Sequence, residues 1–292
     1  MNQSPLALAT RGLFVGGLDL VRGRVKLGLV DPLRFALTAI AIVAALYLGL
    51  WIRSLLAKRV TVIDPFWGLG FMVLGLALAR MVETTTPRTW LMLALVSVWA
   101  LRYATHIWRR SWGHDEASLY YPYAEQRAKH GRNFWWVSLF TVFTPQMLGH
   151  LVIGLPMLMV LYAPGSAELG LLDGLGAAIA LTGTLVEGVA DTQMRRFKAD
   201  PSKRGTTLET GLWRYSRHPN YFGDALCFWG LGVVGLGSPL GVWGLIGPAV
   251  LTVLLRTQGV RMLETRSKIG GRPAYAAYVA RTSAFVPWWP KG

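Results

Sequence analysis

The sequence predicts an all-α fold, a polytopic integral membrane protein built as a seven-transmembrane-helix bundle, and three observations support this. Of the 292 residues, 53% are hydrophobic and only 15% are charged, whereas soluble domains carry about 25% charged residues. The mean hydropathy is positive, at +0.38. Apolar runs recur at the length of about 20 residues that a helix needs to cross a bilayer.

Composition also excludes several classes of protein. The net charge is +15, but the low charge density leaves no continuous polar face for a phosphate backbone, so nucleic-acid binding is not expected. The single cysteine, Cys227, forms neither an intramolecular disulfide nor a cysteine-based metal cluster. We therefore expect membrane lipids as partners and no metal.

Each apolar run bounded by charged or turn-forming residues predicts one span. The runs cover approximately residues 33–56, 62–80, 88–110, 134–162, 170–195, 221–237 and 240–258. The last two are separated only by Gly237, Ser238 and Pro239, which favour a tight helical hairpin. We expect residues 32–292 to form one domain and residues 1–31 to form an N-terminal segment, either a surface helix or an additional span.

The distribution of Lys and Arg predicts the orientation. These residues concentrate after the first, third and fifth predicted spans and in the C-terminal tail, which places those segments in the cytoplasm. The connections after the fourth and sixth spans contain neither residue type and are expected to face outward. With seven spans, the N-terminus would then lie outside. This conflicts with the rule that basic residues favour the cytoplasmic side, because five of them lie near the N-terminus: Arg11, Arg22, Arg24, Lys26 and Arg34.

Acidic side chains inside predicted spans indicate a functional site, because each costs about 2.5–3.5 kcal/mol on insertion. Glu187 and Asp191 are four residues apart and share one helical face, which Arg195 and Lys198 extend toward the cytoplasm. An intrahelical pair of Asp191 with Arg195 is the structural alternative, but it leaves Glu187 unpaired. Asp64 lies at the start of the second span, where N-capping before Pro65 is an equally good explanation.

The third predicted span carries a basic stripe of Arg102, His106 and Arg109, with Tyr103 beside it. Snorkelling to the membrane interface explains Arg109 and suits the deeper Arg102 poorly. His150 stands alone in an apolar run and is expected to be a hydrogen-bonded core residue rather than a ligand.

The segment from Gly211 to Asp224 is the densest in polar and aromatic groups, including Trp213, Tyr215, Arg217, His218 and Tyr221. Pro219 is expected to end an irregular loop, and Asn220 to cap the following helix, whose N-terminus favours an anion. The arginines and the histidine would add charge-assisted bonds to phosphates, and the aromatic rings would hold a flat ring. A membrane-interface belt is the alternative.

Two further motifs lie near this segment. After the last span, Glu264 is followed by Tyr275 and Tyr278, which share a helical face and predict a cytoplasmic lid over the loop before the sixth span. The run Gly230-Leu-Gly-Val-Val-Gly235 matches a dinucleotide fingerprint, but it lies inside an apolar span without a preceding strand. Close helix packing explains that run better.

Together these residues resemble the membrane steroid 5-alpha-reductase family, particularly its bacterial branch, over about residues 60–290. The resemblance rests on Asp-Pro-Phe-Trp-Gly at residues 64–68, Arg102 to Arg110, Glu187 with Asp191, the Tyr215 to Asp224 run, and the tail from Glu264. It implies a bacterial inner-membrane protein that binds NADPH from the cytoplasmic side. It also implies reduction of the carbon-carbon double bond of a lipophilic enone, typically a 3-oxo-4-ene steroid.

The resemblance implies a role for individual residues. Glu187, Asp191, Lys198, Asn220 and Asp224 fall where the family contacts NADPH, and Arg217, His218 and Tyr221 adjoin them. Lys198 departs from the Arg that is usual in the animal enzymes. The expected cofactor site also includes charged and aromatic residues of the same segments: Arg109, Arg195, Tyr215, Glu264 and Tyr275.

The implied catalytic residues are Asp64, in place of a Glu that binds the substrate carbonyl, and either Tyr103 or His106 as its partner. Hydride from NADPH would reach the enone while Tyr103, oriented by Asp64, stabilises the developing enolate. An apolar cavity between the first four spans would hold the substrate.

Two rival functions remain open. A membrane methyltransferase that uses S-adenosylmethionine, of the isoprenylcysteine-methylating type, shares an Arg-His-Pro-x-Tyr run and a C-terminal Glu with spaced Tyr residues. Seven rather than about five spans, and surplus Arg and Lys, favour the reductase. A transporter or lipid-binding protein would explain the intramembrane acids, but the inverted repeat expected of many transporters is missing.

Overall fold

The computed structural model describes residues 19–21, 24–26, 31–111, 121–266 and 273–291. In this part of the chain, five helical stretches are long and apolar enough to cross a membrane. They are Pro32–Ala57, Val60–Ala79, Pro87–Ser111, Tyr123–Ile153 and Leu171–Ala199. The chain is thus a helical integral membrane protein, as its composition predicts.

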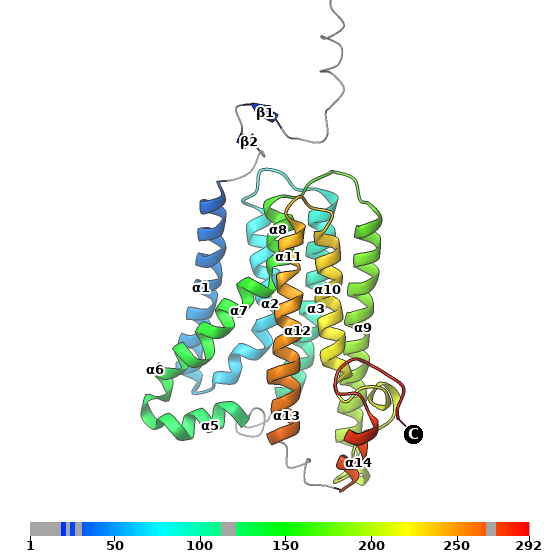
Figure 1. Ribbon diagram of the computed structural model, residues 1–292. Coiled ribbons are helices and arrows are strands. Elements are labelled where there is room, and N and C mark those ends of the chain that lie inside the picture. The colour runs from blue at the N-terminus through cyan, green and yellow to red at the C-terminus, as the bar shows by residue number, and fades with distance from the viewer. Residues whose placement is uncertain (1–18, 22–23, 27–30, 112–120, 267–272, 292) are drawn as a thin grey trace, which may run out of the picture.

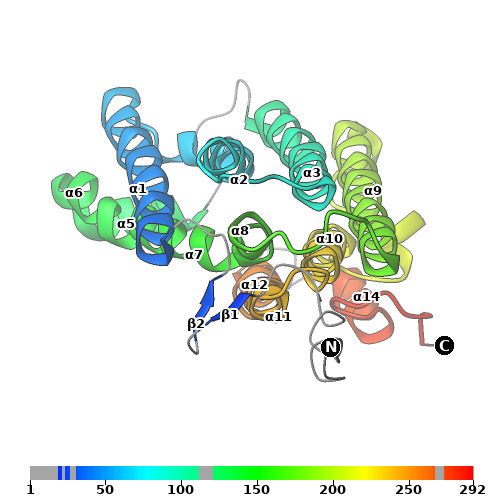
Figure 2. The same cartoon turned by 90° about the horizontal axis from the view of Figure 1, so that it is seen from above.

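The helices pack side by side as a bundle (Figures 1 and 2). Their bounds are α1 Pro32–Ala57, α2 Ile63–Ala79, α3 Pro87–Ser111, α5 Tyr121–His130, α6 Phe134–Ser138, α7 Thr144–Ile153, α8 Leu155–Tyr162, α9 Leu171–Ala199, α10 Pro219–Gly235, α11 Gly241–Gly244, α12 Ile246–Leu254, α13 Arg261–Arg266 and α14 Pro273–Arg281. Seen from above, α10 has α9 on one side and α8 and α12 on the other.

The C-terminal ends of α1, α3 and α9 all lie toward the lower end of the bundle in Figure 1, which we call the basic end. It carries exposed cations at the ends of these helices: Lys58 directly after α1, Arg109 and Arg110 in α3, and Arg195 and Lys198 in α9. The connection before α10 and helix α14 lie at the same end. The basic segments that the sequence assigns to one side of the membrane are therefore together.

The predicted spans at 134–162 and 240–258 are not single helices. In the first, residues Leu139–Phe143 form a π-helical segment before α7, and Gly154 separates α7 from α8. In the second, α11 and α12 are followed by a π-helical segment at Leu255–Val260. Two prolines explain why new helices begin inside the first of these spans. Pro145 and Pro156 lie in the first turns of α7 and α8, where a backbone N–H has no partner within the helix and its absence costs little.

Helices α9 and α10 pack at very short range through small residues. A Cβ on Gly183 would lie 2.3 Å from the backbone nitrogen of Cys227, and a Cβ on Gly230 would lie 2.3 Å from that of Ala180. Both positions therefore need glycine for the helices to approach this closely. The prediction that the glycine run at 230–235 serves helix packing is confirmed for Gly230.

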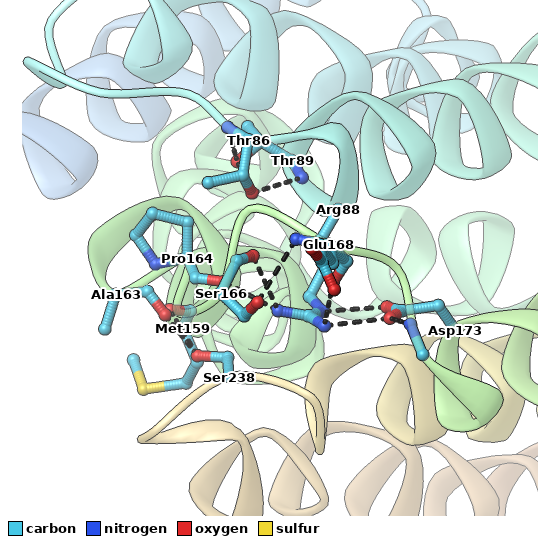
Figure 3. Close-up of polar contacts among 11 residues, drawn as sticks. Thr86, Arg88, Thr89, Met159, Ala163, Pro164, Ser166, Glu168, Asp173 and Ser238 are labelled. Atoms are coloured by element: carbon cyan, nitrogen blue, oxygen red, sulfur yellow. Dashed lines mark hydrogen bonds and ion pairs between the residues drawn. The ribbon is translucent and has the colours of Figure 1, made fainter. Parts of the chain in front are cut away.

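A buried ion pair closes the opposite end of the bundle (Figure 3). The Nε and Nη2 atoms of Arg88 donate to the two carboxylate oxygens of Asp173 at 2.7 and 2.8 Å. Its Nη1 also donates to the carbonyl of Pro164 at 2.9 Å. Arg88 thus ties the start of α3 to the start of α9 and to the connection before it. Arg88 is a basic residue at the end of the bundle that is predicted to face outward. Because Asp173 neutralises its charge, it does not contradict the predicted orientation.

The two N-terminal strands and helix α5 differ from the prediction. Residues Asp19–Val21 and Arg24–Lys26 pair as antiparallel strands, whereas the sequence predicts a surface helix or a span in this segment. Of residues 1–31, the structure describes only these two strands and Asp31. Asp31 caps α1 by accepting from the backbone nitrogens of Leu33 and Arg34. Helix α5, which the sequence did not predict, runs across the basic end.

Candidate functional site

Arg102 on α3 joins the two acidic residues of α9. Its Nη1 donates to Asp191 Oδ2 at 2.8 Å, and its Nη2 forms an ion pair with Glu187 Oε1. Trp99, one turn earlier on α3, donates its indole N–H to Glu187 Oε2 at 3.2 Å. The intrahelical alternative leaves Glu187 without a partner, whereas the structure gives it two partners from the neighbouring helix α3.

A third carboxylate, Asp224 on α10, is buried beside this pair. The Cβ that Gly223 lacks would lie 2.5 Å from the backbone nitrogen of Glu187, so α9 and α10 are in close contact at this level. Asp224 Oδ1 is buried and has no hydrogen-bond partner among the described residues. Such an oxygen is costly to bury and is suited to a donor from a ligand.

Asn220 does not cap α10, contrary to the prediction. It lies inside the first turn, and its Nδ2 donates to Asp191 Oδ1 at 3.3 Å. The cap position is His218, and no side chain caps the helix there. Asn220 Oδ1 is a second buried acceptor with no partner among the described residues. Tertiary contact with α9 thus overrides the local preference of Asn for the cap.

His106 continues the stripe on α3, with its Nδ1 3.6 Å from Asp191 Oδ2. The three carboxylates, Glu187, Asp191 and Asp224, are each at least 93% buried. In the described part of the chain, Arg102 is the only arginine or lysine within ion-pair distance of any of them. We call the three acids, together with Arg102, His106 and Asn220, the acidic cluster. Its carboxylates outnumber its permanent cations three to one. Arg109, Arg195 and Lys198 lie exposed beyond it at the basic end.

The loop before α10 is held against α9. Gly211 has φ +64°, and its missing Cβ would lie 2.4 Å from Gln193 Nε2, so only glycine fits there without strain. The backbone nitrogen of Leu212 donates to Gln193 Oε1 at 3.1 Å. Trp213 donates its indole N–H to the carbonyl of Ala190 at 3.1 Å. These bonds fix the loop next to Asp191.

Arg217 and His218 face Glu264, the acid that follows the last predicted span. Arg217 makes a bidentate pair with it, at 2.7 and 3.0 Å, and His218 Nε2 is 3.2 Å from Glu264 Oε1. Partial burial raises the pKa of Glu264, but the bonds from His218 and Arg217 outweigh burial and hold the pKa at about 2. The Glu264 side chain is therefore a carboxylate at neutral pH.

The C-terminal tail packs on this loop, at the place where the sequence predicts a lid. Tyr278 donates its hydroxyl to the carbonyl of Trp213, and Ser216 Oγ donates to the carbonyl of Phe285 at 2.8 Å. Burial raises the pKa of the Tyr278 hydroxyl above its usual range, so it remains a donor. Tyr275 lies next to Tyr278, with ring centroids 6.1 Å apart.

Two aromatic residues of the loop region also find ring partners. The Tyr215 ring makes an edge contact with Trp289 of the tail, with centroids 5.4 Å apart. Tyr221 lies parallel to the imidazole of His218 at 5.5 Å. The predicted cofactor residues of the loop are thus in contact with the tail or with each other.

Asp64 does not act as the N-cap of α2. The cap position is Val62, and Asp64 lies in the first turn, where its Oδ1 accepts from the Tyr123 hydroxyl at 3.1 Å. Tyr123 comes from α5 and also accepts from Gln146 Nε2 at 3.4 Å. The sequence gives no sign of this partner, because Tyr123 lies outside the predicted spans and no spacing links it to Asp64.

Tyr103 and His150 belong to an aromatic layer between the helices. Tyr103 stacks on Trp99 with ring centroids 5.4 Å apart. Its ring packs directly against Gly68 of α2, where a Cβ would lie 2.8 Å from the ring. His150 is fully buried, stacks on Phe71 at 3.7 Å and has its Nδ1 3.4 Å from the Tyr47 hydroxyl. The prediction of a core histidine is confirmed. These rings occupy the region between α1, α2, α3 and α7 where a substrate cavity is expected.

The fold and the charged residues buried near its basic end define a helical integral membrane protein with a polar site inside the bundle. The model of a family described as "Protein of unknown function (DUF1295)" matches residues 50–282, and the chain belongs to this family. Comparison with curated proteins gives no match. Comparison with solved structures also gives none.

Proposed function

We propose that this protein reduces the carbon-carbon double bond of a 3-oxo-4-ene steroid or a similar lipophilic enone, with NADPH as the reductant. The observation that carries the proposal is that α3, α9, α10 and the tail bring their polar residues to one end of the bundle. These are the residues on which the resemblance to membrane steroid 5-alpha-reductases rests.

The two kinds of polar residue suit different parts of the nucleotide. The cations beyond the acidic cluster, Arg109, Arg195 and Lys198, would hold its phosphates. The buried oxygens of Asp224 and Asn220, which have no partner among the described residues, would accept from hydroxyl or amide donors of its sugar and base groups. NADPH would supply a hydride when bound.

The protein's own contribution to the reaction is orientation and charge stabilisation. Tyr103 would donate a hydrogen bond to the carbonyl oxygen of the enone and stabilise the negative charge that develops there. Asp64, held by Tyr123, would orient that contact. The surrounding rings, Trp67, Trp99 and Phe71, exclude water from the reacting atoms.

The proposed topology adds two spans to the five long helices. Helix α10 would be the sixth span, and α11 with α12 and the following π-helical segment would be the seventh. The basic end would lie in the cytoplasm of a bacterial cell, with the protein in the inner membrane. NADPH would then reach its site from the cytoplasm, and a lipophilic substrate would enter from the bilayer.

The test is transfer of deuterium from C4-deuterated NADPH to the β carbon of an added enone by purified protein. Tyr103→Phe and Asp64→Ala are expected to abolish the transfer while leaving NADPH binding intact. Transfer at the wild-type rate in both variants, in protein shown to be folded, would reject these two roles.

A second candidate, an S-adenosylmethionine-dependent methyltransferase, is favoured by one observation. The buried carboxylates of the acidic cluster outnumber its permanent cations, and a cationic sulfonium would balance them better than a polyanion would. The Arg217 to Tyr221 run and Glu264 occur in that class as well. Binding of the two cofactors to the same preparation separates the candidates.

A further inference from the structure

The C-terminal tail presents a pair of bulky aromatic side chains that are mostly exposed, although the Trp289 ring touches Tyr215 at one edge. Trp288 is 70% exposed and Trp289 is 71% exposed, and Val286 nearby is 53% exposed. Phe285, in contrast, is buried, with only 6% of its surface exposed. The tail therefore has one face toward the protein and one apolar face away from it. Exposed clusters of this kind mark a contact with a membrane or a partner.

The packing of the tail fixes the level of these tryptophans along the bundle. Phe285 packs against Phe222 and Ala225 in the first two turns of α10, and against Val260. The backbone nitrogen of Trp288 donates to the carbonyl of Tyr215 at 2.9 Å, in the loop before α10. Trp288 and Trp289 consequently lie where the apolar surface of the helices meets the loop before α10.

Charge near the tail fits an anionic surface. Arg214 precedes Tyr215 in the loop, Lys291 follows Trp289 in the tail, and both are exposed. Arg196, at the end of α9, is exposed as well. Tryptophan is enriched at the headgroup level of membranes, and basic residues beside the membrane are attracted to anionic lipids.

We propose that Trp288 and Trp289 insert into the headgroup region of an anionic bilayer at the basic end and anchor the C-terminal tail to the membrane surface. The tail would then be held on two sides, by the loop residues Trp213 to Arg217 and by the lipid. This anchor does not depend on which cofactor the protein binds.

Spin labelling tests the proposal directly, because the only cysteine, Cys227, is fully buried and stays unlabelled in the folded protein. The labelled variants are Trp288→Cys, Leu185→Cys on the exposed middle of α9 as a lipid reference, and Arg204→Cys in an exposed loop as a water reference. The protein is placed in nanodiscs of phosphatidylcholine and phosphatidylglycerol. Accessibility to oxygen and to a water-soluble nickel chelate is then measured.

The label at position 288 should fall between the two references and favour oxygen over the chelate. Two results would overturn the proposal: accessibility equal to that of the label at position 204, which places the tail in water, or exclusion of both reagents, which indicates burial against a second copy of the chain or another protein.

A second measurement keeps the full chain without a label. Trypsin cleavage after Arg281 is followed in the same nanodiscs for the Trp288→Ser/Trp289→Ser and Trp288→Tyr/Trp289→Tyr variants. Because cleavage follows the population of the released tail, the serine pair should be cut about fivefold faster or more. The tyrosine pair should resemble the wild type, since tyrosine also favours the interface. Equal rates for the serine pair and the wild type would contradict the anchor.

Discussion

The guanidinium of Arg102 on α3 binds the carboxylate of Asp191 on α9, with Nη1 2.8 Å from Oδ2. The same guanidinium pairs with Glu187 one turn away. A single cation therefore compensates two buried carboxylates, and it links two spans that are distant in the sequence.

Loss of this cation should be costly. Replacing Arg102 by Met keeps much of the volume but leaves the buried Glu187 and Asp191 without a permanent cation, which we expect to lower the free energy of unfolding by about 3–5 kcal/mol. Thermal unfolding in detergent measures the change. Arg109→Met, at an exposed site on the same helix, should change stability by no more than about 0.5 kcal/mol. Equal melting temperatures for the two variants would show that Arg102 is not needed to neutralise the acids.

The contact between α9 and α10 predicts a position-dependent effect of alanine. Gly183→Ala places a Cβ 2.3 Å from the backbone nitrogen of Cys227 and should destabilise the protein by about 1–3 kcal/mol. Gly174→Ala lies on the same helix in open space, so it should be neutral or stabilising by up to about 1 kcal/mol. Chemical unfolding of both variants tests this. A Gly183 variant as stable as the Gly174 variant would mean that the helices separate at little cost.

The Glu264 contacts predict a pH dependence. The pKa of Glu264 is held at about 2 in the folded protein, below its ordinary value of 4.5, because hydrogen bonds from His218 and Arg217 outweigh the effect of burial. A lowered folded-state pKa adds stability that is full above the ordinary value and is lost as the pH falls toward the folded value. The stability difference between the wild type and Glu264→Gln should therefore be constant above about pH 5 and shrink between about pH 4.5 and 2. A difference that does not change over this range would contradict the assignment.

The exposed cations predict a selective effect on nucleotide affinity. If Arg195 holds a phosphate of NADPH, Arg195→Ala should weaken NADPH binding about tenfold or more, since hydrogen bonds to charged groups contribute about 1.5–3 kcal/mol. Arg196→Ala, at the next residue and also exposed, is the control and should have little effect. Isothermal titration at low and high salt measures both. A similar loss in the two variants would indicate general charge attraction without a specific contact.

The sequence predicts the long spans well, because each is a continuous apolar run whose length the bilayer determines. The bounds of α1, α3 and α9 lie within a few residues of the prediction. The broken helices at 134–162 and 240–258 escaped prediction, since an apolar run gives no sign of a π-helical segment.

The site was predictable in residue type but not in pairing. Buried acids and a deep arginine are visible in the sequence, because charge in a span is rare. Which of them pair depends on which helices are neighbours, and no spacing within α9 connects Glu187 to Arg102. Asn220 shows the same limit, because a strong local preference for the cap is overridden by Asp191 on another helix.

The proposed reaction depends on the binding of NADPH at the polar end of this bundle. Equilibrium unfolding of the purified protein in nanodiscs, with NADPH or S-adenosylmethionine added at increasing concentration, tests it most directly. NADPH at about one hundred times its dissociation constant should stabilise the protein by about 2.7 kcal/mol, while S-adenosylmethionine at the same concentration leaves stability unchanged. Stabilisation by S-adenosylmethionine and none by NADPH would contradict the reductase and support the methyltransferase.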